Sequence, residues 1–376
     1  MEKQPKRLKK VSGGPLKEVW ETDGTNSLEV VYLEDRGLRV AKKNTSIACR
    51  HFDFLKSAGI STGYNGRVSP TSFLSYRRDQ ILLRINVRRY ERSESPESKL
   101  FRFSELVIEF FLETEDKKFQ GEDLGIDNPL INNPLADNWL LQGLDGKVLE
   151  KKVEAVKACG NLTIAEIRNT AKKIFLLLEK AWSNLGFCLY DLELRFDTLL
   201  QVSRAIDSES FRIFRQNQWL GKPWLDKEKS QAIDLDTLSE LSIFLCLPRQ
   251  FLFFWQDQAE ALPLNPKFPG LNFVTARKEF LSRNIGPLRG EAEKYPDGAV
   301  IIINLGKEDS LNESIARLMA NESSFPIIGF YSDKEKSGLI RPVAGSKLLI
   351  ASCSKTAMEN ACRILGQKNP VIYAQL

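Results

Sequence analysis

Charged and apolar residues alternate over residues 188–196, and polar residues gather again over residues 207–212. In the first run Asp191, Glu193 and Arg195 occupy every second position, which places them on one face of an extended strand. The second run carries these polar groups: Asp207, Glu209, Ser210, Arg212. Carboxylates can hold a magnesium ion, and an arginine beside them can hold a phosphate. The pattern predicts a metal–phosphate site, although the exposed face of an antiparallel hairpin would show the same alternation.

Strands and a helix must position these groups. The alternation predicts two strands, over residues 188–196 and 199–206. A helix is predicted from Thr163 to Leu185, because Thr163 and Glu166 form a capping box ahead of apolar residues at helical spacing. Other predicted elements are strands over residues 28–33, 81–90 and 105–111 and a helix over 47–58. This part of the chain therefore predicts an α+β fold.

The C-terminal part alternates strands with helices. Strands are predicted over residues 271–274, 299–304, 325–329 and 347–351, and helices over 311–321 and 355–365. This order is typical of a parallel α/β sheet. Residues 232–260 are predicted as helix, and prolines with a glycine make 261–270 a linker. The predicted domains are residues 1–260, with lobes 1–85 and 86–260, and residues 271–376.

Composition excludes several classes of protein. The net charge of +5 comes from mixed charges, so a nucleic-acid binder is not expected, and neither a membrane span nor a secretory leader is expected from the apolar runs. The six cysteines lie far apart, which indicates reduced, mostly buried thiols and a cytoplasmic location. The only histidine, His51, is expected to be structural. Basic residues 3–10 predict a solvated leader, with a nucleic-acid or import patch as the alternative.

The central motifs resemble those of SAICAR synthetase (phosphoribosylaminoimidazole-succinocarboxamide synthetase), an ATP-dependent ligase of purine synthesis that animals fuse to AIR carboxylase. The family pattern V-D-x-K-x-E-F-G corresponds to residues 190–197, and A-D-x-I-D-x-D-S-x-R to residues 203–212. Residues 354–366 resemble the closing helix of the carboxylase. The resemblance implies two synthetase-like, ATP-grasp-related lobes followed by a truncated three-layer α/β carboxylase-like domain, in a divergent and degenerate paralogue of the bifunctional enzyme.

The same resemblance assigns residue roles. The positions that match ATP- and magnesium-binding residues are Gly14, Lys17, Asp191, Asp207 and Glu209. Those that match substrate-binding residues are Arg89, Ser210 and Arg212. Asp207 and Glu209 would hold magnesium only if the ligase works.

Among the departures from the family pattern, four affect positions with an assigned role. Pro15 replaces a lysine of the glycine turn, Glu193 replaces a substrate-binding lysine, and Arg204 replaces an aspartate. Arg277 falls where the carboxylase has its proton-transferring histidine, and an arginine cannot exchange a proton near neutral pH. Carboxylase activity is therefore expected to be lost, and no catalytic residue is expected to be intact. Glu193 and Arg204 are expected to form a structural ion pair.

Two functions follow from the resemblance. The first is a non-catalytic scaffold, regulator or ligand-binding protein without a cofactor, which forms homo-oligomers or hetero-oligomers with the active enzyme. The second is a divergent working ligase that forms an amide with ATP and Mg²⁺ but lacks carboxylase activity. A third possibility, an interaction module, rests on the basic residues 3–10 alone.

Overall fold

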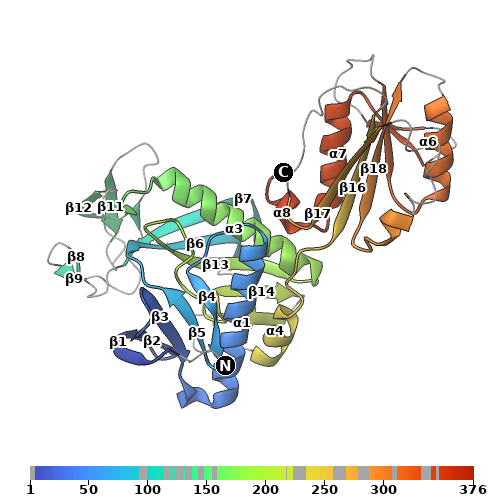
Figure 1. The fold of residues 1–376 in the computed structure, drawn as a ribbon. Helices are drawn as coiled ribbons and strands as arrows, with labels where there is room; N and C mark the ends of the chain where they lie inside the picture. The colour runs from blue at the N-terminus through green and yellow to red at the C-terminus, as the bar shows by residue number, and fades with distance from the viewer. Residues whose placement is uncertain are drawn as a thin grey trace. The chain divides into compact units, whose positions relative to one another are not determined.

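A computed structural model of the chain describes residues 5–92, 100–113, 159–216, 218–222, 234–256, 268–277, 290–306, 311–331, 340–343 and 347–376 (Figure 1). It also describes residue 288 and five short strands: β8 Lys118–Phe119, β9 Glu122–Asp123, β10 Leu130–Ile131, β11 Asn138–Gln142 and β12 Val148–Glu154. The chain divides into two units, Met1–Cys246 and Leu247–Leu376.

The first unit begins with an antiparallel five-stranded sheet in the order β1-β2-β3-β5-β4. Its strands are β1 Arg7–Gly13, β2 Lys17–Thr22, β3 Ser27–Tyr32, β4 Tyr64–Ser69 and β5 Ser72–Tyr76. After the short 3-10 helix η1 (Glu34–Arg36), helix α1 (Leu38–Ser57) packs on this sheet. Phe52 of the helix stacks on Tyr64 and meets Phe73 edge-on, so three buried rings fix the helix to the sheet.

A second antiparallel sheet of the same unit has the order β15-β14-β13-β6-β7. It consists of β6 Gln80–Arg92, β7 Leu100–Leu112, β13 Cys188–Asp197, β14 Phe211–Arg215 and β15 Gln218–Gly221. Helix α3 (Ile164–Asn184) covers one face, and its predicted capping box is present, with Thr163 as N-cap and Glu166 bonded back to it. The helix buries an apolar stripe, and Gly186, at φ 83°, follows its end. The predicted helix over residues 163–185 is thus confirmed.

The predicted strand over residues 199–206 is wrong. The segment is a turn and loop with only isolated bridges at Val202, and the strand that pairs with β13 is β14. The reason is local: the carboxylate of Asp197 accepts hydrogen bonds from the backbone amides of Leu199 and Gln201, both at 2.9 Å. Such a side-chain turn competes with a strand ladder, and it leaves Leu200 at φ 60°.

The predicted helix over residues 232–260 is wrong beyond its first part. Helix α4 spans only Leu235–Ser242, and β16 (Gln250–Gln256) is a strand of the second unit. Residues 251–255 are all apolar and buried, as in strands covered on both faces, and periodicity cannot separate such a run from a buried helix. The second unit therefore begins before the predicted linker, whose residues 261–267 lie outside the described part.

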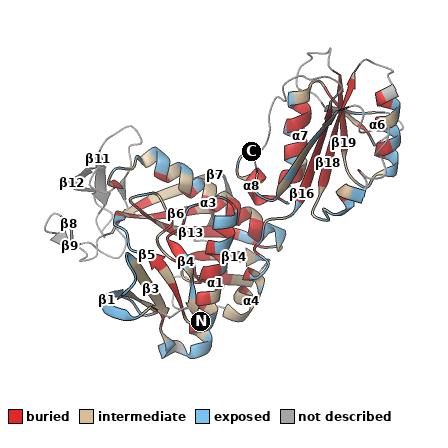
Figure 2. Cartoon of the chain, viewed as in Figure 1, coloured by how far each residue is buried: buried red, intermediate tan, exposed pale blue. Residues whose placement is uncertain are grey.

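The second unit is a six-stranded sheet in the order β17-β16-β18-β19-β21-β20, parallel except for β20. The further strands are β17 Leu271–Arg277, β18 Ala299–Gly306, β19 Ile327–Tyr331, β20 Ile340–Pro342 and β21 Leu349–Ala351. Helix α6 (Leu311–Glu322) lies on one face, and α7 (Ser354–Gly366) with α8 (Pro370–Tyr373) lies on the other (Figure 1). Figure 2 shows the central strands as buried, and only the last residue of β18 is partly exposed. The predicted α/β alternation is confirmed.

Two smaller expectations need correction. Residues 7–10 are exposed, as expected of a solvated segment, but they do not precede the first strand, because they lie in β1 and Arg7 binds Glu29 through two nitrogens at 2.6 and 2.9 Å. The cysteines are free, but Cys188 and Cys246 are exposed rather than buried. In the described residues, no helix combines the length and apolar character that a bilayer crossing needs.

His51 is structural, as predicted. It lies on α1 without solvent exposure, its ring is 4.9 Å from that of Phe211 and 5.8 Å from that of Trp182, and Nδ1 donates to the carbonyl of Ile47 at 2.8 Å. Burial in this aromatic site lowers the pKa of His51 from 6.5 to about 4, against the opposing effect of the Ile47 carbonyl. The folded chain therefore holds this ring neutral at neutral pH.

We expect this histidine to make the first unit sensitive to mild acid. The unfolded chain takes up a proton below pH 6.5 and the folded chain only near pH 4, so stability present above pH 6.5 is lost as the pH falls through this window. The loss should reach about 3 kcal/mol at pH 4. A His51→Phe variant should show a shallower pH dependence of unfolding. Because the chain has one histidine, its NMR titration is unambiguous, and a midpoint near 6.5 would contradict the prediction.

Candidate functional site

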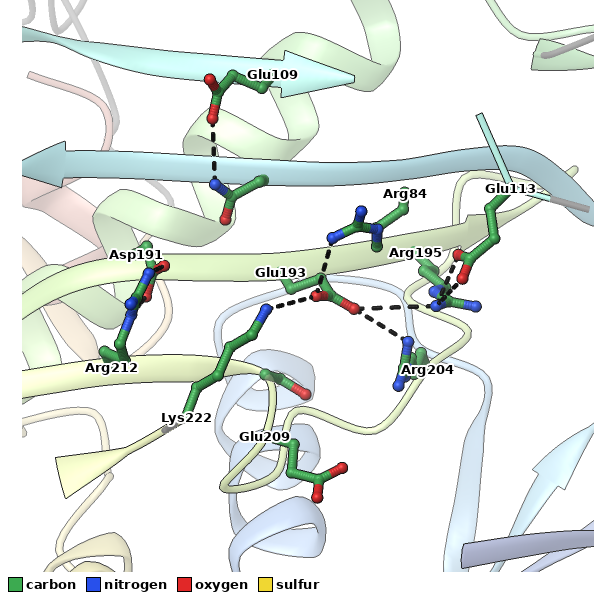
Figure 3. A network of polar contacts seen from close by, with 12 residues as sticks. Arg84, Glu109, Glu113, Asp191, Glu193, Arg195, Arg204, Glu209, Arg212 and Lys222 are labelled. Carbon is green, nitrogen blue, oxygen red and sulfur yellow. Dashed lines mark hydrogen bonds and ion pairs between the residues drawn. The ribbon is translucent and has the colours of Figure 1, made fainter. Parts of the chain in front are cut away.

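The face of the second sheet opposite α3 is polar. On β13, Asp191, Glu193 and Arg195 lie opposite Arg88, Asn86 and Arg84 of β6, respectively. The next strand, β7, adds Glu109, and the loop after it adds Glu113. Strand alternation therefore gathers charged groups from three strands on one surface, as the sequence of residues 188–196 predicts (Figure 3).

Glu193 is the centre of this surface. Its side chain is 10% exposed, and its carboxylate contacts four basic groups: Arg204 Nη1 at 3.0 Å, Lys222 Nζ at 3.0 Å, Arg84 Nη1 at 3.5 Å and Arg195 Nη2 at 3.9 Å (Figure 3). Burial alone would raise the pKa of Glu193, but these cations lower it to about 2. The predicted pair between Glu193 and Arg204 is confirmed, and it is one contact of a larger cluster.

Asp191 and Arg212, both predicted to bind ligands, bind each other. Nε of Arg212 donates to Oδ1 of Asp191 at 2.9 Å, and the second nitrogen contacts Oδ2. The guanidinium also lies 4.9 Å from the ring centre of Tyr190. A bidentate pair that is also packed on an aromatic ring uses the same fork geometry that would hold a phosphate or carboxylate.

Asp207 is fully buried and accepts four hydrogen bonds. Oδ2 contacts Nζ of Lys17 and accepts from the hydroxyl of Tyr32 at 2.7 Å, whereas Oδ1 accepts from the amide of Glu209 at 3.1 Å and the hydroxyl of Ser210 at 3.2 Å. Burial would raise the pKa of Asp207, but Lys17 and Tyr32 lower it below its ordinary value. Burial also lowers the pKa of Lys17, and the nearby Arg204 adds to that effect.

The surroundings of Asp207 do not fit a magnesium ligand. A metal would have to displace Lys17 or Tyr32 from Oδ2, or the backbone amide and Ser210 from Oδ1, and magnesium demands near-ideal octahedral geometry. Glu209 lies apart from the Glu193 cluster (Figure 3). Over the residues that the structure describes, no group of three His, Cys, Asp or Glu side chains could hold a metal ion.

A pocket of about 300 Å³ lies beside these groups. Residues 12–17 of the β1–β2 turn form one wall, and residues from the second sheet and its loop form the other: Gln80, Arg195, Ser203, Arg204, Ala205, Glu209. The amide of Gly14 donates to the carbonyl of Lys17 at 2.9 Å, and Pro15 has no amide hydrogen. A turn is therefore present where the sequence predicts one, but Gly14 and Pro15 offer no free amide to a phosphate.

One predicted residue is not brought to this surface. Arg89 lies on the opposite face of the sheet and makes a buried, bidentate pair with Glu179 of α3, with Nε to Oε1 at 2.8 Å and Nη2 to Oε2 at 3.0 Å. Its role in substrate binding stays a prediction, and in the structure the side chain links the helix to the sheet. Arg277 ends β17 in the other unit, and its side chain lies outside the described part.

Three members of the site were not predicted from the sequence: Tyr32, Arg84 and Lys222. Arg195 was placed on the polar face, although the family pattern has a glutamate at its position. Arg84 carried a signal in the sequence, because it shares the polar alternation of β6. Tyr32 and Lys222 meet Asp207 and Glu193 only through contacts between residues 175 and 29 positions apart.

Comparison with known proteins finds similar sequences and structures among phosphoribosylaminoimidazole-succinocarboxamide synthases. The chain is 28% identical over 204 residues to the phosphoribosylaminoimidazole-succinocarboxamide synthase of Chloroflexus aggregans, which covers 50% of this chain and 69% of that protein. The synthase of Lactococcus lactis subsp. cremoris is 24% identical over 206 residues, or 52% of this chain and 78% of that protein. The crystal structure of the Ehrlichia chaffeensis synthase aligns with 63% of this chain and 98% of its own, with 15% identity and a TM-score of 0.46. No protein-family model matches.

The chain is therefore related to these synthases at modest identity over about half its length. The resemblance of its central motifs to SAICAR synthetase is confirmed in that sense. The likeness of the second unit to AIR carboxylase stays a prediction.

The Glu193 cluster yields a stability prediction. Glu193→Gln leaves the surrounding cations without their buried counter-charge, which should destabilise the first unit by about 3–5 kcal/mol. Glu109→Gln is the matched control on the same face, since its side chain is 36% exposed and its pair with Arg88 spans 3.2 Å; it should cost at most about 1 kcal/mol. Denaturant unfolding followed by tryptophan fluorescence reports mainly this unit, because five of six tryptophans precede residue 247. Equal losses in the two variants would contradict the role of Glu193.

Proposed function

We propose that this chain is a non-catalytic relative of the SAICAR synthases that serves as a ligand-binding or scaffold protein. The observation that carries the proposal is the Glu193 cluster. A carboxylate occupies the position where the family pattern has a substrate-binding lysine, and four basic groups contact it. Groups that would hold substrates in an active relative are thus engaged with one another.

The other polar residues support the same proposal. Asp191 is paired with Arg212, Asp207 is saturated by protein donors, and Arg89 faces α3. At an effective dielectric constant near 20, each charge reversed about 4 Å from a phosphate costs on the order of 4 kcal/mol. Reversal at Glu193 would therefore remove several powers of ten of affinity for an anionic substrate. The change from an aspartate to Arg204 removes a carboxylate that could hold a metal ion.

For the second unit we propose descent from an AIR carboxylase-like domain. The parallel sheet with helices on both faces supports this, as does the match of residues 354–366, which form α7. Arg277 at the position of the proton-transferring histidine argues against carboxylation, and no histidine follows His51. A cytoplasmic homo-oligomer, or a hetero-oligomer with an active relative, is part of the same proposal.

A working ligase is the second candidate, and the pocket beneath the β1–β2 turn favours it. Lys17 and Glu209 line this pocket together with Gly14, so three predicted nucleotide-site positions still surround one space. ATP and Mg²⁺ would be the cofactors under this hypothesis alone.

An assay of the full chain separates the two candidates. With MgATP, aspartate and the carboxylated aminoimidazole ribonucleotide, we expect no succinyl-amide product and no stabilisation by MgATP, whereas the Lactococcus lactis protein assayed in parallel should form product. Product formation that is abolished by Glu209→Ala would establish the ligase and refute the proposal.

Restoring the charges should restore part of the lost affinity. The triple variant Glu193→Lys, Arg195→Glu, Arg204→Asp reproduces the family pattern at all three reversed positions while it leaves opposite charges adjacent. We expect a melting-temperature rise with the carboxylated aminoimidazole ribonucleotide that the wild type lacks, since a ligand at 100 times its Kd stabilises by about 2.7 kcal/mol. An unchanged response in a folded triple variant would show that charge reversal is not what separates this chain from the synthases.

A further inference from the structure

The pocket beside the β1–β2 turn carries an excess of positive charge. Three cations line it, Lys17, Arg195 and Arg204, together with one carboxylate, Glu209. Their nearest internal counter-charges are Asp207 for Lys17 and Glu193 and Glu113 for the two arginines. The cations also disfavour one another: burial and then the charge of Arg204 lower the pKa of Arg195 to about 10, and Arg204 lowers that of Lys17 as well. An anion in the pocket would relieve this repulsion.

The turn offers fewer free amides than a phosphate loop. A phosphate loop supplies several free amides, but here Gly14 uses its amide within the turn and Pro15 has none. Side chains must therefore supply much of the contact to an anion. Two guanidinium groups hold oxygen atoms through planar forks, which favours one compact phosphate group over an extended chain of them.

Donors for such a group are present on the pocket wall. Arg204 is 32% exposed, and within the described residues only its Nη1 contacts a partner, Glu193, although a guanidinium carries five N–H donors. The hydroxyl of Ser203, the adjacent residue, has no hydrogen-bond partner in the described part of the chain. A buried hydroxyl without a partner costs free energy, which a bound oxygen acceptor would recover.

Asp207 does not fit a metal-bridged nucleotide, because all four of its hydrogen bonds come from the protein. We propose that this pocket binds a phosphate monoester directly, without a divalent metal, with Arg204 in the place where the family pattern has an aspartate. A phosphate monoester carries about −1.5 to −2 charges at pH 7, and the pocket lies at the small end of the range that holds small molecules, about 300–1,000 Å³. The inference rests on the proposed function and names the ligand class of a non-catalytic site.

The test is calorimetric titration of the full chain with inorganic phosphate, ribose 5-phosphate and AMP, each with EDTA and again with Mg²⁺. We expect a monophosphate to bind in EDTA, with no gain from Mg²⁺ and weaker binding at higher salt. Arg204→Gln should weaken it about tenfold or more, the scale of one charge-assisted hydrogen bond. Tighter binding of AMP would point to a nucleotide and tighter binding of ribose 5-phosphate to a phosphosugar; either supports the proposal.

Lys222→Gln is the matched control. Lys222 also contacts Glu193 at 3.0 Å and is 33% exposed, but it does not line the pocket. It should leave the affinity within about twofold, since it contributes only a distant, screened charge. Equal weakening by both variants, or no binding of any probe, would overturn the inference and leave the proposed absence of catalysis standing. Binding of ATP that requires Mg²⁺ would overturn the inference and count against the proposed function as well.

Discussion

The carboxylate of Glu193, largely removed from water, holds four basic side chains on one face of the second sheet. One comes from the neighbouring strand β6, one from β13 itself, one from the loop before β14 and one from the residue after β15. Without this anion their mutual repulsion would act in a largely buried region, where it is poorly screened. The loop that carries Arg204 and Asp207 therefore takes its position from an electrostatic constraint as much as from packing.

Pairing of opposite charges within the protein extends over the rest of the polar surface. Asp191 with Arg212, Asp207 with Lys17, and Arg195 with Glu113 are matched pairs within the protein. A ligand-binding enzyme leaves such groups partly unsatisfied so that the substrate completes them. Internal pairing lowers the free energy of the unliganded fold, so these groups gain less free energy when a substrate binds. The stability of this face is in this way connected to the proposed loss of catalysis.

Features that depend on neighbouring residues could be predicted from the sequence. The polar face of β13 follows from strand alternation, and α3 from its capping box and apolar stripe. The segment after Asp197 was missed because a side-chain hydrogen bond ended the strand. Strand β16 was assigned to a helix because an apolar run buried on both faces has no period. Tyr32 and Lys222 could not be found, since their roles arise only when distant segments pair.

The buried contact between Lys17 and Asp207 joins the first sheet to the loop that precedes β14, and Tyr32 adds a second bond from β3 to the same oxygen. Separating the first sheet from this loop would break the pair between Asp207 and Lys17, and breaking a buried ion pair costs free energy. Hinge opening between them is thus costly. A small molecule should then enter or leave the pocket when surface side chains move, while the backbone of the first sheet and of this loop stays in place.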